Sequence, residues 1–489
     1  MTIMRISRLL TIMLAAAASL TAYGQSIRIS EAGVTYVHSS ANTGDMTFNG
    51  SVLNVEGRQY LLAPQTSMTV TADGVDDNTV SVTYNGTQAE VVVAGNIARY
   101  LTVNANGADV SILAAPELQQ SVEYTLRGTS ADGSFYMDGE YAATVILDNL
   151  TLTNADSAAI NIQDGKLITI NLVGQSTIAD AQGMANNACL YVNGHAKFTG
   201  AGTLNVTGNA KHGITGDEHL IIEGGTINVN AVGDGLHVSE YFKQTGGSLT
   251  INAQGDGVDI GFKGVNKGTK DQYADNGFAF LEGGTMDVTT TGEATRGVKA
   301  DSTILVAGIT ATVRTTGNAC YDATKNDISS AAAIKTGGAF SMTSGTLTLS
   351  STGSAGKGIN ATDNVTLAGG KLDVVTTGAV YVYGAEDSKP HGVKTDADIN
   401  ISGGTILVAA SGDSGSAFKT DYYFTISGGT VMAVGGKASK PTSATQKYYT
   451  YTGVSVTPGQ TLSYNGVSAT MPDNYSVASG KVLVSSPTM

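Results

Sequence analysis

The stretch that decides the fold reads Asp234-Gly235-Leu236-His237, then Gly246-Gly247-Ser248-Leu249-Thr250-Ile251, then Asp256-Gly257-Val258-Asp259. It contains one repeat unit and the start of the next, and the two Asp-Gly turns lie 22 residues apart. Each unit combines an apolar triplet, a Gly-rich turn, an alternating strand and a short third strand. The same period extends over most of the chain.

A Thr, Ser or Lys marks the same position of each unit, directly after the Gly-rich turn. The markers are Thr203, Thr226, Ser248, Thr285, Thr310, Thr346, Lys371, Thr405 and Thr430. Successive steps are 23, 22, 37, 25, 36, 25, 34 and 25 residues, which indicates a period in the low twenties with three insertions. The residues one and three positions after each marker are apolar, so both should face a core.

Three short strands per unit cannot bury an apolar face alone, but parallel stacking of units buries it continuously. The repeat therefore predicts an all-β fold, a parallel β-helix with three-strand rungs of about 22–25 residues. We expect a signal peptide at 1–24, an N-terminal β module at 25–115, the β-helix at 116–436 and a C-terminal β cap at 437–489. The signal peptide follows from basic Arg5 and Arg8, a short apolar run and small residues before Gln25, and it predicts secretion to the cell surface, the periplasm or the medium.

The composition argues against several classes of protein. A net charge of −14 disfavours nucleic-acid and anionic-membrane partners. No apolar run after the signal segment is long enough for membrane insertion. Cys189 and Cys320, the two cysteines, are too few for a disulfide-stapled scaffold, so we expect each to be a buried or loop thiol.

Two polar columns flank the Gly-apolar pair of each unit and change from acidic to basic along the repeat. The first is His212, Asp234, Asp256, Arg296, Ala332, Lys357, His391 and Ser416, and the second is Thr215, His237, Asp259, Lys299, Lys335, Asn360, Lys394 and Lys419. Asp234, Asp256 and Asp259 fall on adjacent units, about 4.8 Å apart, where carboxylates can share a hard cation. We predict calcium at these three residues. The alternative is ordinary Asp-Gly turn chemistry, and His237 is interpreted as a polar neighbour because calcium prefers oxygen.

The basic end of the second column predicts carbohydrate contacts. Lys299, Lys335, Lys394 and Lys419 suit the carboxylates of an acidic polysaccharide, although pairing with an Asp two residues further on also explains three of them.

The insertions at 261–276, 320–330 and 381–390 should lie along one side of the fold, where loops on a rigid scaffold usually bind ligands. Their tyrosines Tyr273, Tyr321, Tyr381 and Tyr383 are candidate sugar contacts in a chain without Trp. The alternative is that the insertions are solvated excursions.

Several segments carry a family resemblance. They are Tyr124-Thr125-Leu126-Arg127-Gly128-Thr129, Val145-Ile146-Leu147-Asp148-Asn149-Leu150, Ser157-Ala158-Ala159-Ile160, Ile222-Glu223-Gly224-Gly225-Thr226 and Gly297-Val298-Lys299-Ala300-Asp301. Over residues 121–436 the chain resembles a family of bacterial carbohydrate-binding right-handed parallel β-helices whose founding examples bind cellulose and acidic pectic sugars. The resemblance implies a pectate-lyase-type β-helix, calcium binding, and secreted polysaccharide binding without catalysis.

Two other functions remain open at this stage. In a calcium-assisted polysaccharide lyase, the three Asp residues would hold the ion against a uronate while Lys263 or Lys299 removes the adjacent proton. In a surface adhesin or matrix protein, the repeat would serve as a structural spacer. The leading prediction is a non-catalytic protein that binds polysaccharide.

Overall fold

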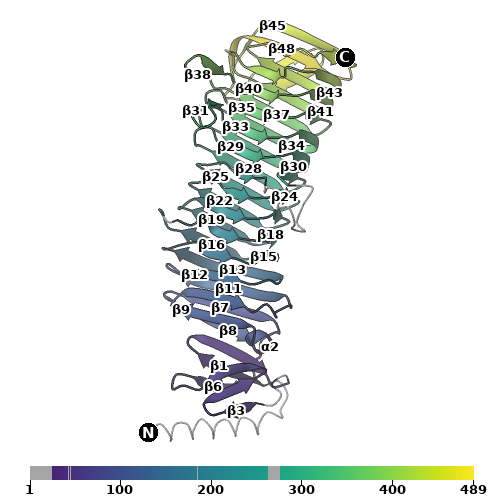
Figure 1. Ribbon diagram of the computed structural model, residues 1–489. Coiled ribbons are helices and arrows are strands. Elements are labelled where there is room, and N and C mark those ends of the chain that lie inside the picture. The colour runs from purple at the N-terminus through teal and green to yellow at the C-terminus, as the bar shows by residue number, and fades with distance from the viewer. Residues whose placement is uncertain (1–24, 42, 44–45, 184, 263–275, 413) are drawn as a thin grey trace. The chain divides into compact units, whose positions relative to one another are not determined.

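The computed structural model of the 489-residue chain describes residues 25–41, 43, 46–183, 185–262, 276–412 and 414–489. This part is built almost entirely of β-strands (Figure 1), and α2 (Gly95–Ala98) is its single helix. None of the described segments is a helix of the length and apolar character needed to cross a membrane. The predicted signal peptide at 1–24 lies outside the described residues. Two compact units are present, residues 1–155 with 159–177, and residues 156–158 with 178–489.

The first unit begins with antiparallel strands and continues with parallel ones. Strand β1 (Ser26–Glu31) pairs antiparallel with β2 (Val34–Ser39) and β6 (Ser67–Thr71). Strands β7 (Thr79–Asn85) and β8 (Gln88–Ala94) pair antiparallel in a hairpin that turns at Asn85-Gly86. Strand β11 (Val122–Ser130) then runs parallel to both β7 and β13 (Ala143–Asn154). The unit also contains β3 (Thr47–Asn49), β4 (Val52–Val55), β5 (Arg58–Leu61), β9 (Leu101–Asn106), β10 (Asp109–Ala114), β12 (Ser134–Asp138), β14 (Ile160–Ile162) and β15 (Leu167–Val173).

In the second unit the marker residues pair in register. The marker strands are β19 (Thr203–Gly208), β22 (Thr226–Ala231), β25 (Ser248–Ala253), β28 (Thr285–Thr290), β30 (Ile304–Thr315), β34 (Phe340–Ser351), β37 (Lys371–Thr376), β41 (Ile399–Ala409) and β43 (Phe424–Gly435). They run parallel, and every marker lies opposite the next one. The residues one and three positions after the markers, such as Ile227 and Val229, are buried. The predicted period, parallel pairing and core columns are therefore confirmed.

A second ladder precedes the marker strands in each unit of the repeat. It contains β18 (His195–Gly200), β21 (Leu220–Ile222), β24 (Tyr241–Gln244), β27 (Phe278–Leu281) and β36 (Val365–Leu367). Both β27 and β28 pair with the long strand β30, so the two ladders belong to one sheet, sheet A. The hydrogen bonds of sheet A include a closed ring of twelve parallel strands.

This closure corrects the predicted fold class. The all-β class is confirmed, but a right-handed parallel β-helix with three separate strands per rung is wrong, because sheet A has the connectivity of a closed twelve-strand parallel β-barrel. The physical reason lies at the Gly-rich turns. In β34 and β41 the turn glycines Gly345 and Gly404 take positive φ values, and the strand continues through a bulge with a register shift. What the sequence presents as a turn between two strands is then one long strand.

The third strand of each repeat unit belongs to a different sheet, sheet C, which is parallel throughout the second unit. Its strands there are β17 (Ala188–Val192), β20 (His212–Gly216), β23 (Leu236–Val238), β26 (Val258–Ile260), β29 (Arg296–Ala300), β33 (Ala332–Thr336), β35 (Lys357–Ala361), β40 (His391–Thr395) and β42 (Ser416–Lys419). The glycine near the start of most of these strands faces the core. A Cβ at Gly257 would lie 2.3 Å from the Val288 side chain and 2.4 Å from the Gly297 carbonyl oxygen. The absence of a side chain lets sheet C approach the marker strands closely.

The C-terminal segment packs on the last marker strand. Strand β48 (Val477–Ser485) pairs antiparallel with β43 and with β45 (Tyr448–Val456). Tyr475 is buried beneath these strands and donates a hydrogen bond of 2.8 Å to the Ala410 carbonyl oxygen. The segment also contains β44 (Ser443–Ala444), β46 (Thr461–Tyr464) and β47 (Val467–Thr470). Both cysteines are free, with Cys189 buried in β17 and Cys320 half-buried, as predicted.

Candidate functional site

The two polar columns predicted from the repeat lie side by side on sheet C. We call them the start column (His212, Asp234, Asp256, Arg296, Ala332, Lys357, His391 and Ser416) and the outward column (Thr215, His237, Asp259, Lys299, Lys335, Asn360, Lys394 and Lys419). Every neighbouring pair of the outward column is in parallel register. The backbone hydrogen bonds from Gly213 to Asp234 and from Gly235 to Asp256 place the start-column residues on successive turns. The predicted alignment of these residues in two columns is confirmed.

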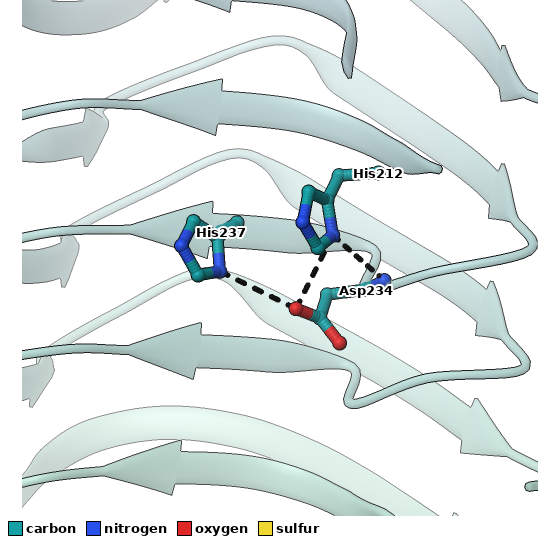
Figure 2. A group of neighbouring side chains, drawn as sticks. All are labelled: His212, Asp234 and His237. Carbon is teal, nitrogen blue, oxygen red and sulfur yellow. Dashed lines mark hydrogen bonds and ion pairs between the residues drawn. The ribbon is translucent and has the colours of Figure 1, made fainter. Parts of the chain in front are cut away.

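At the acidic end, one carboxylate lies between two imidazoles. Asp234 Oδ2 is 3.2 Å from His212 Nδ1 and 3.3 Å from His237 Nδ1 (Figure 2). The two rings stack with centroids 4.7 Å apart and an interplanar angle of 12°. Burial lowers the pKa of His212 to about 4, so its ring is neutral at pH 7. Hydrogen bonds to Asp234 and Asp259 raise the pKa of His237 to about 9, so this ring is an imidazolium.

The carboxylate of Asp259 is held by two cationic side chains. Its Oδ2 lies 3.2 Å from His237 Nδ1, and its Oδ1 lies 2.6 Å from Lys299 Nζ. Burial raises the pKa of Asp259, but the hydrogen bonds from His237 and Lys299 outweigh it and bring the pKa to about 2. The same pairing raises the pKa of Lys299 against the effect of burial.

The three predicted calcium ligands are neighbours, but their oxygens already accept hydrogen bonds. Asp234 Oδ1 accepts the Asp256 backbone N–H at 2.8 Å, and Asp256 Oδ1 accepts the Arg296 backbone N–H at 2.7 Å. Burial also raises the pKa of Asp256 to about 6. Calcium takes six to eight oxygen ligands, whereas here His237 and Lys299 lie between the carboxylates. The arrangement as it stands does not offer calcium a set of free carboxylate oxygens.

Further along the outward column, three lysines pair locally and one does not. Lys394 Nζ lies 2.7 Å from Asp396, Lys419 contacts Asp421, and Lys299 bridges to Asp259 and Asp301. Lys335 has no ion pair in the part of the chain that the structure describes. Burial, Arg296 and Lys394 all lower its pKa.

Arg296 in the neighbouring strand β29 is also short of partners. Its Nε is buried without a hydrogen-bond partner, and no carboxylate within the described residues pairs with its guanidinium. Together, Arg296 and Lys335 form a positively charged patch with no ion pair among the described residues, which we call the cationic patch.

Two of the three predicted insertions form short hairpins that meet through their tyrosines. Strand β31 (Cys320–Asp322) pairs with β32 (Asp327–Ser329), and β38 (Tyr381–Tyr383) pairs with β39 (Glu386–Ser388). The rings of Tyr321 and Tyr383 stack 4.0 Å apart at 10°, and Tyr383 remains half exposed. Tyr381 lies in the second hairpin without a stacking partner in the described chain, and Tyr273 is outside the described residues. The expectation that insertions lie along one side is confirmed for this pair.

A lysine that the sequence did not single out as a site residue connects the two hairpins. Lys357 Nζ donates hydrogen bonds to the Ala355 and Lys389 carbonyl oxygens at 2.6 and 2.8 Å, and to Ser388 and Ser330 Oγ at 3.1 and 3.3 Å. Burial, together with Lys394 and Lys335, lowers its pKa to about 7. The sequence places Lys357 in the start column. Three of its four hydrogen-bond partners lie in the insertions, which interrupt the repeat and whose contacts the repeat therefore cannot predict.

An open groove was also missed by sequence reasoning. It has a volume of about 290 Å³ and lies beside the acidic half of the start column. Its lining includes Thr207, Asn209, Asn230, Val232, Asn252 and Gln254. Asn252 donates to Asn230 across adjacent strands at 3.2 Å. Recurrent Asn at matching positions of the repeat was the available signal. Amide groups both donate and accept hydrogen bonds, so the groove suits hydroxyl-rich ligands.

Fold and site together define an all-β repeat protein that presents charged, amide and aromatic side chains on regularly stacked strands. The family of carbohydrate-binding domain-containing proteins matches residues 106–355 and 352–439, more than half of the chain. This chain belongs to that family.

One relative and one solved structure are similar to this chain. A carbohydrate-binding domain-containing protein of Acetivibrio thermocellus is 32% identical over 143 residues, which are 26% of this chain and 50% of the relative. The match thus spans half of that relative's length. A solved structure described as the polysaccharide lyase-like protein from C. thermocellum, in a gadolinium derivative, is 21% identical. It has a TM-score of 0.43 and covers 54% of this chain and 96% of that chain.

Proposed function

We propose that this protein is a secreted, non-catalytic polysaccharide-binding protein whose ligand is an acidic, pectate-like glycan held along the outward face of sheet C. The observation that carries the proposal is the cationic patch. Arg296 and Lys335 are positively charged and partly buried, and no carboxylate of the described chain pairs with them. Partial burial of a cation without an ion-pair partner destabilises the protein, and an anionic ligand would offset that destabilisation. Secretion rests on the segment at 1–24, which lies outside the described residues.

The surroundings of the patch suit a polymer. Successive strands of sheet C repeat about every 4.8 Å, so side chains of one column present contacts at regular intervals. Lys394 and Lys419 continue the column beyond Lys335, and their ion pairs with exposed aspartates are weak enough to exchange for a ligand. Lys299, on the other side of Lys335, is held by the mostly buried carboxylate of Asp259. The half-exposed face of Tyr383 offers a surface for stacking a sugar ring.

Two of the lysines considered as bases do not suit catalysis, whereas Lys335, whose pKa burial lowers, faces the proposed ligand. A lyase needs a base of lowered pKa that reaches the substrate. Asp259 raises the pKa of Lys299, which is the opposite direction. Lys357 has a pKa near 7, but its Nζ is buried within hydrogen-bond distance of four oxygens of the protein. Lys263, the other candidate base, lies outside the described residues.

Affinity electrophoresis tests the proposal directly. We expect the protein to be retarded in gels that contain pectate, and much less in gels that contain a neutral cellulose derivative or fully methyl-esterified pectin, which has the same backbone without charge. Incubation with pectate should produce no absorbance from unsaturated sugars. Equal retardation by the esterified and free polymers would contradict the acidic-glycan proposal, and release of unsaturated products would replace it with a lyase.

Calcium binding at Asp234, Asp256 and Asp259 stays a prediction. Because neighbouring donors occupy the carboxylate oxygens, we expect weak binding, with a dissociation constant of about 10⁻⁴–10⁻³ M, as in other extracellular modules. In isothermal titration calorimetry, Lys299→Met should strengthen calcium binding several-fold because it frees Asp259 Oδ1. Asp256→Asn should weaken it, and Asp301→Asn, a change at an exposed neighbouring carboxylate, should have little effect. Absence of heat, or the same heat in Asp256→Asn, would remove the hypothesis.

A further inference from the structure

The His212, Asp234 and His237 side chains bring three potential metal ligands together, apart from the cationic patch and the tyrosine hairpins. His212 Nδ1, Asp234 Oδ2 and His237 Nδ1 all lie within 4.8 Å of one another. They come from three sequence positions on two successive turns of the repeat, and all point to the same region of the surface (Figure 2). From this geometry we propose that the protein has a binding site for a divalent transition-metal ion of the zinc class, ligated by these three atoms. His237, an imidazolium in the metal-free protein, would release its Nδ1 proton to solvent when the ion binds.

The distances fit such an ion. In a tetrahedral zinc site with bonds of about 2.1 Å, two ligand atoms lie about 3.4 Å apart. The two nitrogen–oxygen separations to Asp234 Oδ2 are 3.2 and 3.3 Å. These two separations match edges of a tetrahedron, and the third, between the two imidazole nitrogens, is at most 4.8 Å and would shorten as the side chains adjust around the ion.

The contact between His212 Nδ1 and Asp234 Oδ2 has no hydrogen atom between the two atoms. His212 Nδ1 accepts a hydrogen bond of 3.0 Å from the Asp234 backbone N–H, so this nitrogen carries a lone pair and no hydrogen. The same nitrogen lies 3.2 Å from Asp234 Oδ2, another lone-pair atom. Two such atoms repel at this distance. A cation shared between them converts the repulsion into attraction, and it would take over the lone pair that now accepts the backbone N–H.

A second, independent observation comes from the adjacent strand. Thr215 lies opposite His237 in the parallel register between β20 and β23. Thr215 is only 4% exposed, and its hydroxyl has no hydrogen-bond partner among the residues that the structure describes. Buried hydroxyls nearly always have a partner, and an unsatisfied one requires an explanation. A hydrated metal ion beside His237 would supply one through a bound water.

The ligand types set the kind of metal. Imidazole nitrogens favour zinc, nickel and copper, whereas calcium and magnesium favour sites built from oxygen. This site therefore differs from the predicted calcium site in composition, although both include Asp234. The backbone N–H of Arg296 holds Asp256 Oδ1, and Asp256 is not among the proposed ligands.

Calorimetry on untagged, chelator-treated protein tests the proposal, with zinc as the titrant and cobalt absorption as a second readout. We expect one zinc ion per chain, little competition from excess calcium, and a visible cobalt spectrum of tetrahedral type. His237→Gln and Asp234→Asn should each weaken zinc binding at least tenfold. Because the His237 side chain is 36% exposed, this substitution leaves the core intact.

The chain offers two matched control variants. His391 occupies the same column as His212, is equally buried, and also accepts a backbone N–H from the next turn, but no carboxylate contacts it in the described residues. His391→Gln should therefore leave zinc binding unchanged. His195→Gln tests the separate pair of His195 with Glu218. The proposal is overturned if wild-type protein binds no zinc, if His237→Gln and Asp234→Asn bind as tightly as wild type, or if His195→Gln abolishes binding.

Discussion

Substitution of Lys335 by glutamate is expected to weaken pectate binding about 30-fold at low ionic strength. A unit charge about 4 Å from a carboxylate contributes about 1 kcal/mol even in water, so reversing its sign changes the binding free energy by about 2 kcal/mol. Lys335 has no competing ion pair within the described chain, so no internal partner is lost; the new glutamate would also attract Arg296 and Lys394, which further reduces their availability to the ligand. Lys335→Gln, which only removes the charge, should have about half that effect in free energy, roughly fivefold.

The control for this result is a lysine with the same charge on another sheet. Lys371 is a marker residue of sheet A, is exposed, and pairs with Asp373 at 2.7 Å. Lys371→Glu changes the net charge by the same amount, but it should leave the retardation in pectate gels nearly unchanged. The effect at Lys335 should also shrink as salt rises, because exposed charges are screened beyond about 8 Å at physiological ionic strength. If both variants lose affinity equally, net charge and not the cationic patch governs binding.

Substitution of Lys357 by methionine is expected to destabilise the protein by about 2 kcal/mol at pH 9. Methionine keeps most of the side-chain volume but leaves the Ala355 and Lys389 carbonyl oxygens without their donor, and a buried unsatisfied group costs about 1–3 kcal/mol. The two hairpins lose the side chain that connects them through Ser330 and Ser388. Denaturant unfolding at fixed pH measures the difference.

The pH dependence of this difference has a defined sign. The pKa of Lys357 falls from 10.5 in the unfolded chain to about 7 in the folded protein, so between these values the unfolded state binds more protons. The free energy of unfolding of the wild type therefore rises as the pH rises from about 7 to about 10.5. Below pH 7 this contribution is absent. The facing groups are Lys335, Lys394 and His391, and burial together with Lys357 and Lys394 keeps His391 neutral with a pKa of about 3.

The stability difference between wild type and Lys357→Met should accordingly be larger at pH 9 than at pH 6.5. Comparison of the two proteins cancels the titration of all other groups. A difference that is constant with pH would mean that the four oxygens hold the ammonium strongly enough to offset its burial. Lys389→Met is the matched control, because its ammonium pairs with Asp387 at the surface of the same hairpin.

Loosening of the two hairpins should also weaken binding of the polysaccharide. Tyr321 and Tyr383 lie 62 residues apart in the chain, and their stacking depends on hairpins that Lys357 holds together. Lys357→Met is therefore expected to reduce pectate retardation as well as stability, whereas Lys389→Met should reduce neither.

Several features of the fold followed from the sequence because each depends on neighbours within one repeat. Alternation of apolar residues after the marker decides which side chains are buried, and a constant step decides which residues become strand neighbours. Both are local properties, and the pairing of Thr226 with Ser248 confirms them. The correction to the fold class has a different origin. Whether a Gly-rich turn ends a strand, or bends it through a bulge as at Gly345, depends on hydrogen bonds to the adjacent turn, which composition does not reveal.

For the candidate site, too, some features followed from the sequence and others only from the tertiary structure. The sequence by itself determined the two columns on sheet C and their change of sign, because parallel register converts equal spacing into contact. The carbohydrate-binding domain family was indicated by resemblance and not by the spacing. Only the tertiary structure decided which charges pair. His237 lies between Asp234 and Asp259, and Lys335 and Arg296 have no ion pair with a carboxylate of the described chain. Lys357 is buried where it contacts two hairpins. Side-chain rotamers and insertion geometry set these contacts, and neither is periodic, so no repeat pattern encodes them.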